Sequence, residues 1–427
     1  RKEKSLEAII EQKKPSGFRR FINKLGNFFS KPQNIILVVF AVILSVLVFI
    51  PMFEVFKDTF IIHEGAALED IGENVAGELN FYSWGKMMTG KYAVKNFWKP
   101  LGNTLLMSAL SCLFAVLFGG IVAYLITRTN LKFKKYISSI FIFPYIMPQW
   151  TLAMVWKNLF DSVAVTGTKN GIFAYFFGIT MPQWWCAGLF PCALIMGLHY
   201  APFAYILIGG IFRNMDANLE EAATILNTPK IKIFFKVTLP LVMPAILSTV
   251  LLVFSSAMGS YPVPHYLGYA AGGYEFSTLA TKYMDLNVNN PAGASIISVI
   301  MMVIGFGILI VNQFSTSGRK QYTTVSGKSG QTSKVNLGNA GKYIIGIILI
   351  VTTTFTSIFP IFSFALETFL ENPGDYSALT LKWWINRAQG EEVGMYGNLG
   401  IIFNRNIWVA FGGSVLVAVL SAFCAGI

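Results

Sequence analysis

Between two long apolar segments lies the polar stretch Arg213-Asn-Met-Asp-Ala-Asn-Leu-Glu-Glu-Ala-Ala-Thr-Ile-Leu-Asn-Thr-Pro229, which runs on to Thr238-Leu-Pro240. Residue types that begin and end helices follow one another here in an order that predicts a helical hairpin. Asn218 can cap a first helix, and Glu221 three residues later completes a capping-box pattern. Loops between membrane helices rarely carry such signals, so we expect this one to contact another protein.

The second helix of the hairpin is predicted from the residues that follow. Asn227 readily takes the left-handed conformation that ends a helix, and Thr228 can cap the next helix with Pro229 at its first position. Pro240 is expected to end that second helix. Its expected apolar face, turned toward the rest of the molecule, consists of Ile231, Phe234, Phe235 and Leu239, with Lys230, Lys232 and Lys236 lying away from it.

The composition is that of a protein embedded in lipid. Hydrophobic residues make up 54% of the 427 residues and charged residues only 13%, about half of the charged fraction of a soluble domain. The four cysteines lack the spacing of metal ligands, so we expect small buried apolar side chains and no metal site. They are Cys112, Cys186, Cys192 and Cys424.

Seven uncharged apolar runs are long enough to cross a membrane, which takes about 20 residues of helix. They cover residues 35–53, 102–127, 137–156, 187–212, 242–260, 292–314 and 343–366. An eighth starts near Ile407 and continues to Ile427, so we expect a chain truncated within a membrane helix. The fold class is therefore all-α and polytopic. We expect kinks or close helix packing at Gly119-Gly120, Gly209-Gly210 and the pair Pro144 and Pro148.

The basic residues indicate which ends of these helices face the cytoplasm. With the N-terminus inside, residues 1–34, 128–136, 213–241 and 315–342 hold 22 of the 33 Lys and Arg residues. Of the 21 acidic residues, 15 then lie outside. This distribution follows the positive-inside rule and accounts for the net charge of +12 without nucleic-acid binding. The hairpin is thus predicted to be cytoplasmic.

The chain is expected to divide into four parts. Residues 1–34 are a basic cytoplasmic segment, in which Phe18–Phe29 is predicted to be an amphipathic helix on the membrane surface or, alternatively, a solvated tail. Residues 35–314 form a first half with six membrane helices. Residues 315–342 are a flexible linker rich in Ser, Thr, Gly and Lys. Residues 343–427 begin a second half.

The two halves carry similar segments in the same order. Leu79–Trp84 precedes the helix that begins at Leu101, as Leu379–Trp384 precedes a segment from Phe411 that matches it at an offset of 310 residues. An internal repeat predicts two related halves, of which the second would carry its own copy of the hairpin.

Glu221-Ala222-Ala223, followed by Asn227 and by Val237-Thr238-Leu239-Pro240, resembles the EAA loop of binding-protein-dependent ABC importer permeases. The family pattern has Gly where this chain has Asn227, and it finishes in Leu-Pro. The flanking segments His199–Tyr205 and Gly259–Pro264 also fit. The double-length layout is similar to the fused permeases of the iron(III), thiamine and 2-aminoethylphosphonate type, and the resemblance covers residues from about 75 to 427.

The resemblance implies the ABC importer permease fold in a bacterial inner membrane, with no catalytic residues and no cofactor on this chain. It implies as partners two ATP-binding subunits, into which the loop docks, and an extracytoplasmic solute-binding protein. The residues it assigns to this coupling loop are Glu220, Glu221, Ala222, Ala223, Asn227, Leu239 and Pro240. Iron(III) is the first solute it suggests, followed by thiamine, phosphonate or polyamine.

An ion-coupled secondary transporter is the alternative. Such proteins generally carry Asp, Glu, Lys or Arg inside the membrane, and none lies in the seven complete runs. His199 is the one central ionisable side chain, and we expect it to bond a neighbouring helix rather than to line a solute path. Without an internal proton or ion relay, the energy is expected to come from a separate ATPase.

A membrane-embedded enzyme finds no support in the residue pattern. Neither a Ser-His-acid set nor a metal-binding cluster is recognisable, and Ser326-Gly-Lys-Ser329 lacks the earlier Gly of a phosphate-binding loop. Tyr261 and Pro262 are expected to break the fifth helix at its outer end, either as a plain helix terminus or as a gate on the solute path.

Overall fold

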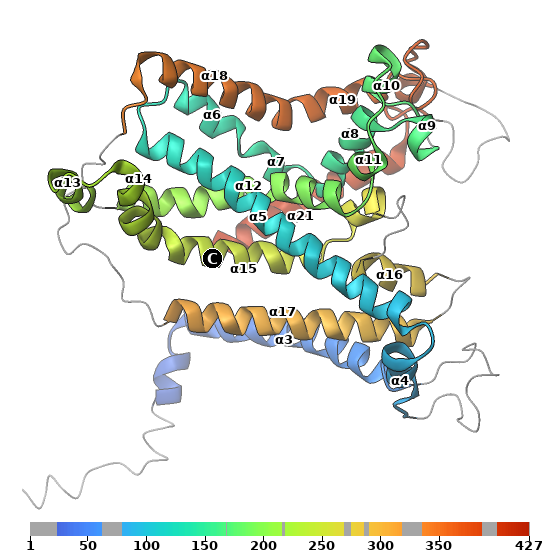
Figure 1. The fold of residues 1–427 in the computed structure, drawn as a ribbon. Coiled ribbons are helices and arrows are strands. Elements are labelled where there is room, and N and C mark those ends of the chain that lie inside the picture. The colour runs from blue at the N-terminus through green and yellow to red at the C-terminus, as the bar shows by residue number, and fades with distance from the viewer. Residues whose placement is uncertain are drawn as a thin grey trace, which may run out of the picture.

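The computed structural model describes residues 24–61, 79–167, 169–215, 218–268, 275–285, 290–317, 335–386 and 399–426. Within these ranges the chain is helical and contains isolated β-bridges but no sheet. Most of the long helices lie side by side in one bundle (Figure 1), whereas the last one, Arg405–Gly426, has no buried residue. The all-α, polytopic expectation is confirmed.

Seven helical spans in the described ranges are long and apolar enough to cross a membrane. The helices that form them are α3 (Pro32–Asp58), α5 (Lys99–Arg128), α12 (Leu189–Asn214), α15 (Leu239–Met258), α17 (Pro291–Ser317), α18 (Gly338–Ser357) with α19 (Phe359–Glu367), and α21 (Arg405–Gly426). They coincide with every predicted run except the one at 137–156.

That run is a broken span. It consists of α6 (Lys134–Ile140), α7 (Phe143–Ile146) and α8 (Gln149–Phe160), and the chain bends by 99° between Ile146 and Gln149. Pro148 stands in the break with an extended ψ of 141°. Because Pro148 has no N–H, the carbonyl of Pro144 lacks the partner that a continuous helix would give it. The expected kink at these two prolines is confirmed as a complete break.

His199, in the middle of α12, provides the missing donor. Its Nδ1 lies 2.8 Å from the carbonyl oxygen of Pro144, and since a carbonyl only accepts, Nδ1 carries the proton. The imidazole is buried and contacts the rings of Tyr145 and Tyr200. The prediction that His199 bonds a neighbouring helix is confirmed.

Helices α5 and α12 approach each other closely through two glycines. A Cβ atom on Gly119 would lie 2.2 Å from the carbonyl oxygen of Ala201, and one on Gly197 would lie 2.3 Å from Cβ of Phe114. Neither position accepts a larger residue without moving a helix. The expectation is thus right for Gly119 and wrong for Gly209-Gly210, where Cβ atoms would find ordinary contacts or open space.

Two spans begin with a π-helical turn followed by a proline. Turn η2 (Val94–Trp98) precedes Pro100 in α5, and η3 (Phe234–Thr238) precedes Pro240 in α15. In a π-turn each N–H bonds five residues back, which shifts the hydrogen-bond register ahead of the proline. The proline then sits in the first turn of the next helix, where its missing N–H matters least. Pro240 therefore does not end the helix as predicted, since the span continues from Ile231 to Met258.

Short elements cover the two ends of the bundle. One end carries α13 (Asn218–Ile225) and α14 (Lys230–Ile233), and we call it the hairpin end (Figure 1). The opposite end carries α4 (Tyr82–Thr89), α9 (Val163–Thr166), α10 (Ile172–Phe177), α11 (Gln183–Cys186), η4 (Pro264–Gly268), α16 (Phe276–Tyr283) and α20 (Lys382–Ile385). Of the predicted amphipathic helix at residues 18–29, residues 24–29 are described and are helical, while its position on a membrane surface stays a prediction. Most of the linker lies outside the described residues.

Replacing His199 by Leu should lower the free energy of unfolding by about 1–3 kcal/mol, because it leaves the buried carbonyl of Pro144 without a donor. Gln at the same position keeps an N–H donor and should cost less. Denaturant titration of the protein in detergent micelles measures both variants, and a Leu variant as stable as the parent would contradict the assigned bond.

Candidate functional site

The hairpin end contains the two-helix structure predicted from residues 213–240. Helix α13 ends where Asn227 takes a φ of 52°, in the left-handed region. The N–H of Thr228 bonds the carbonyl of Ala223 at 3.1 Å, and the N–H of Asn227 bonds that of Thr224 at 3.0 Å. This pair of bonds is a Schellman motif, so the prediction for Asn227 is confirmed. The proposed cap by the Asn218 side chain lies outside the described side chains.

The two acidic residues of α13 lie on different faces. Glu221 and Ala222 are exposed, and Ala223 is half-buried. Glu220 turns toward the membrane helices, where its side chain is only 14% exposed. Glu221 and the two alanines thus remain available to a partner, whereas Glu220 is engaged within the chain.

Glu220 joins three elements through its two carboxylate oxygens. Oε2 forms an ion pair with Nη2 of Arg128, the last residue of α5. Oε1 accepts a hydrogen bond of 2.7 Å from Oγ1 of Thr238, at the end of η3. Sequence reasoning missed both partners, because Arg128 was counted only toward the positive-inside balance and lies far from Glu220 along the chain.

The buried face of the second helix agrees only in part with the predicted one. Ile233 is buried and Phe234 packs edge-on against the Tyr124 ring of α5 at 5.5 Å, whereas Ile231 and Phe235 are exposed. The prediction is thus wrong for Ile231 and Phe235 and right for Phe234. It assumed α-helical spacing throughout, whereas residues 234–238 form the π-turn η3. At the start of α15, Leu239 is half-buried and Pro240 is exposed.

The end of α5 also meets the segment that leads into α18. The N–H of Val335 bonds the carbonyl of Arg128 at 2.8 Å, and the N–H of Asn130 bonds the carbonyl of Val335 at 3.2 Å. The Asn130 side chain adds bonds to Asn336 and to the N–H of Leu337. Arg128 therefore lies where α5, the hairpin and the start of α18 converge.

A partly buried set of polar side chains lies at the break in the third span. Gln149 donates to the hydroxyl of Tyr200 at 2.6 Å and accepts from Ser260 at 2.6 Å. Ser277 in turn donates to the carbonyl of Ser260 at 2.7 Å. These contacts connect α8, α12, the end of α15 and α16.

Two of the predicted pathway residues follow α15. The helix ends at Met258, before Tyr261 and Pro262, so the predicted helix break is confirmed. The Tyr261 ring stacks on His265, with its hydroxyl 3.0 Å from Nδ1 of that residue. A gating role for Tyr261 and Pro262, and a pathway role for His199, remain predictions.

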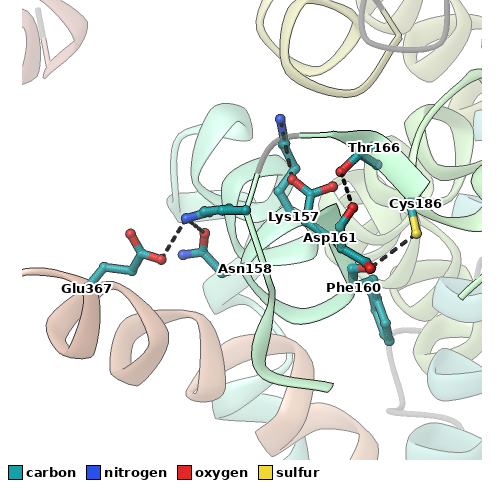
Figure 2. A network of polar contacts seen from close by, with 9 residues as sticks. Lys157, Asn158, Phe160, Asp161, Thr166, Cys186 and Glu367 are labelled. Atoms are coloured by element: carbon teal, nitrogen blue, oxygen red, sulfur yellow. Dashed lines mark hydrogen bonds and ion pairs between the residues drawn. The ribbon is translucent and has the colours of Figure 1, made fainter. Parts of the chain in front are cut away.

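At the end opposite the hairpin, polar contacts tie α8 to α19 (Figure 2). Nζ of Lys169 lies 2.7 Å from Oδ1 of Asn158 and 2.7 Å from Oε1 of Glu367. Lys157 pairs with Asp161 at 3.6 Å, and the Cys186 thiol donates to the carbonyl of Phe160. The first helical span after the linker is thus held against the first half at this end.

Glu275 is a buried acid that sequence reasoning did not single out. It is 2% exposed and precedes α16. A Cβ atom on Gly268 would lie 2.9 Å from its Oε2, and that oxygen has no hydrogen-bond partner among the described residues. Burial raises the pKa of this carboxyl from 4.5 to about 7.

The described residues contain no group of three or more His, Cys, Asp or Glu side chains that could hold a metal ion. Cys112, Cys186 and Cys192 are buried free thiols, and Cys424 is exposed on α21.

Comparison with known proteins identifies the family that the chain resembles. Residues 115–321 match the family model of the binding-protein-dependent transport system inner membrane component. The match covers the broken span, the hairpin and the part of α5 that ends at Arg128. This chain resembles the permeases of ABC importers. A crystal structure of a bacterial ABC transporter involved in the import of the acidic polysaccharide alginate has the same fold, with a TM-score of 0.52 at 16% identity over 70% of this chain and 100% of that one.

Curated relatives of this permease-like chain transport different solutes. A Haemophilus influenzae protein described as a ferric transport system permease is 25% identical over 70% of this chain and 44% of its own length. The spermidine/putrescine transport system permease protein of Salmonella typhimurium is 23% identical over 70% of this chain and 98% of its own length. This chain spans less than half of the ferric relatives of Haemophilus influenzae and Actinobacillus pleuropneumoniae.

Replacing Asn227 should test the turn of the hairpin. Val at this position should destabilise the turn by about 1–2 kcal/mol, because a β-branched residue is strained at positive φ, whereas Gly should leave it intact. Hydrogen–deuterium exchange of residues 218–229 measures the local effect. Equal protection in the Val and Gly variants would contradict the observed conformation.

Glu275 should make the stability of the protein depend on pH. The unfolded carboxyl loses its proton near pH 4.5 and the folded one near pH 7. Between these values the folded state binds more protons than the unfolded state. The stability that the protonated Glu275 carboxyl contributes is therefore fully present below pH 4.5 and is lost as the pH rises toward 7. Replacing Glu275 by Gln should flatten the melting temperature over that interval, and an unchanged slope would refute this assignment.

Proposed function

We propose that this chain is part of the permease of a bacterial ATP-driven ABC importer, in which its helices form the solute pathway. The observation that carries the proposal is the family match over residues 115–321, which contain an exposed two-helix hairpin at one end of the bundle. The hairpin lies on the side of the membrane where most Lys and Arg residues are predicted, which supports a cytoplasmic position for it. The chain is then a multi-pass protein of the inner membrane with its N-terminus in the cytoplasm.

The hairpin is proposed to dock into a groove on a separate ATPase. Its exposed face offers Glu221, a charged group, beside the small side chains of Ala222 and Ala223. Small residues let the partner backbone approach, and an exposed carboxylate can pair with a basic residue. Two ATPase subunits would serve two such hairpins, one in each half, and ATP is bound by those subunits rather than by this chain.

A solute-binding protein is proposed to deliver the solute to the end opposite the hairpin. Iron(III) is the first candidate, because the ferric transport permeases are among the similar curated proteins. The spermidine/putrescine relative makes a polyamine the second candidate. Uptake of radiolabelled iron(III) and of spermidine into cells that express the complete system would distinguish them.

Replacing Glu221 by Arg should abolish capture of the ATPase and ATP-driven uptake, because it places a bulky group of opposite charge on the docking face. Membrane insertion should be normal, since Glu221 is exposed and makes no ion pair in the described structure. Co-purification of the ATPase measures docking. Arg at Glu371, an exposed acid at the opposite end, is the matched control for docking and should leave ATPase capture unchanged.

Two outcomes would contradict the proposal. Unchanged ATPase capture and uptake in the Glu221 variant would exclude the hairpin as the docking site. Uptake into vesicles driven by a proton gradient without ATP would instead favour an ion-coupled secondary transporter.

A further inference from the structure

We propose that the buried pair of Glu220 and Arg128 is the positioning contact that makes α13 move as one body with the membrane helices. The inference rests on the proposed function, since it concerns how movement of a docked hairpin reaches the solute pathway. It assigns a role to Arg128 and Thr238, which lie outside the exposed docking face.

The carboxylate of Glu220 is shared between two membrane-spanning helices. Oε2 pairs with Arg128 at the end of α5, and Oε1 accepts from Thr238 directly before α15. A displacement of α13 must therefore move the ends of both helices or break a charge-assisted bond. Because α5 packs closely on α12 through Gly119 and Gly197, the displacement is carried on into the centre of the bundle.

Burial makes this contact costly to break. The Arg128 side chain is 1% exposed, and its Nη1 has no hydrogen-bond partner among the described residues. Glu220 is consequently the group that compensates the buried positive charge. Separating one partner of such a pair leaves an uncompensated charge in a low-dielectric site, which is far more costly than losing an exposed pair.

The remainder of α13 has little hold on the membrane helices. Its described side chains from Glu221 to Ile225 are exposed, apart from the half-buried Ala223. The apolar contacts that anchor the hairpin come from Ile233 and Phe234, in its second helix. Among the described side chains of α13, Glu220 is therefore the one that forms an ion pair with a membrane-spanning helix.

The same contact reaches the segment that leads into α18. Val335 bonds the backbone of Arg128 and of Asn130, next to the ion pair. A movement delivered to Glu220 thus reaches the first span of the predicted second half as well as the first half. An anchor that only stabilised the fold would not require this convergence of elements.

The test measures the distance between α13 and α5 in the full chain, purified with and without its ATPase partner. Spin labels are placed at Leu226, beside α13, and at Ile121 of α5, both exposed, after the exposed Cys424 is replaced by Ser. In the parent we expect one narrow distance distribution that stays unchanged when ATP and vanadate are added. Glu220→Gln keeps the shape and removes the charge, and should give a broad distribution that shifts with ATP while the ATPase is still captured.

Matched variants separate coupling from folding. Glu221→Gln makes the same chemical change on the exposed neighbour and should leave the distribution narrow. The exchanged pair Glu220→Arg with Arg128→Glu should recover a narrow distribution that Arg128→Glu alone loses. A Glu220→Gln variant with a lower melting temperature but the parent's narrow, ATP-independent distribution would overturn the inference and leave a merely structural pair.

Failure of the proposed function gives a different result. If the parent chain captures no ATPase, docking at the hairpin is refuted. The distributions of ATPase-free parent and Glu220→Gln protein still show whether the pair holds α13 to α5.

Discussion

The structure depends on one constraint, that every backbone polar group at membrane depth must find a partner inside the protein. Prolines break this condition wherever they occur in a span. At three of these prolines the chain compensates in one of two ways: a histidine of another helix donates to the carbonyl orphaned by Pro148, and π-helical turns precede Pro100 and Pro240. The bend of the third span is possible because α12 supplies His199 opposite it.

The same logic applies to charge at the end of the bundle. Arg128 ends a long apolar helix and is buried, so its position there is tolerable only with a carboxylate against it. Glu220 fulfils this requirement and thereby fixes the first helix of the hairpin. The second helix is held differently, by Ile233 and by the contact of Phe234 with Tyr124. The hairpin is thus anchored by one ionic and one apolar contact, and its outer face remains free.

Local features of the chain were predictable from residue type and spacing. The apolar runs predict the spans, and Asn227 predicts the turn, because each depends on neighbours within a few residues. Long-range features were not predictable. Glu220 and Glu221 are adjacent and identical in type, and only the distant Arg128 distinguishes them. The apolar face predicted for the second helix was wrong at Ile231 and Phe235, and no sequence pattern predicts the π-turn at residues 234–238. Gly197 was missed because it stands alone among larger residues.

The span formed by α18 and α19 is attached to the preceding helices at both of its ends. At the hairpin end Val335 bonds to Arg128 and Asn130, and at the opposite end Glu367 pairs with Lys169. Along its length Trp150 packs edge-on against Phe364, and Tyr136 bonds Thr354. The predicted boundary between the repeats precedes this span, yet these contacts place the span with the earlier helices. The contacts with the first half continue beyond Glu367, where the Tyr376 ring packs on Tyr175 and Phe176 of α10. The boundary between the repeats in chain order is therefore not a break in the contacts of the folded chain.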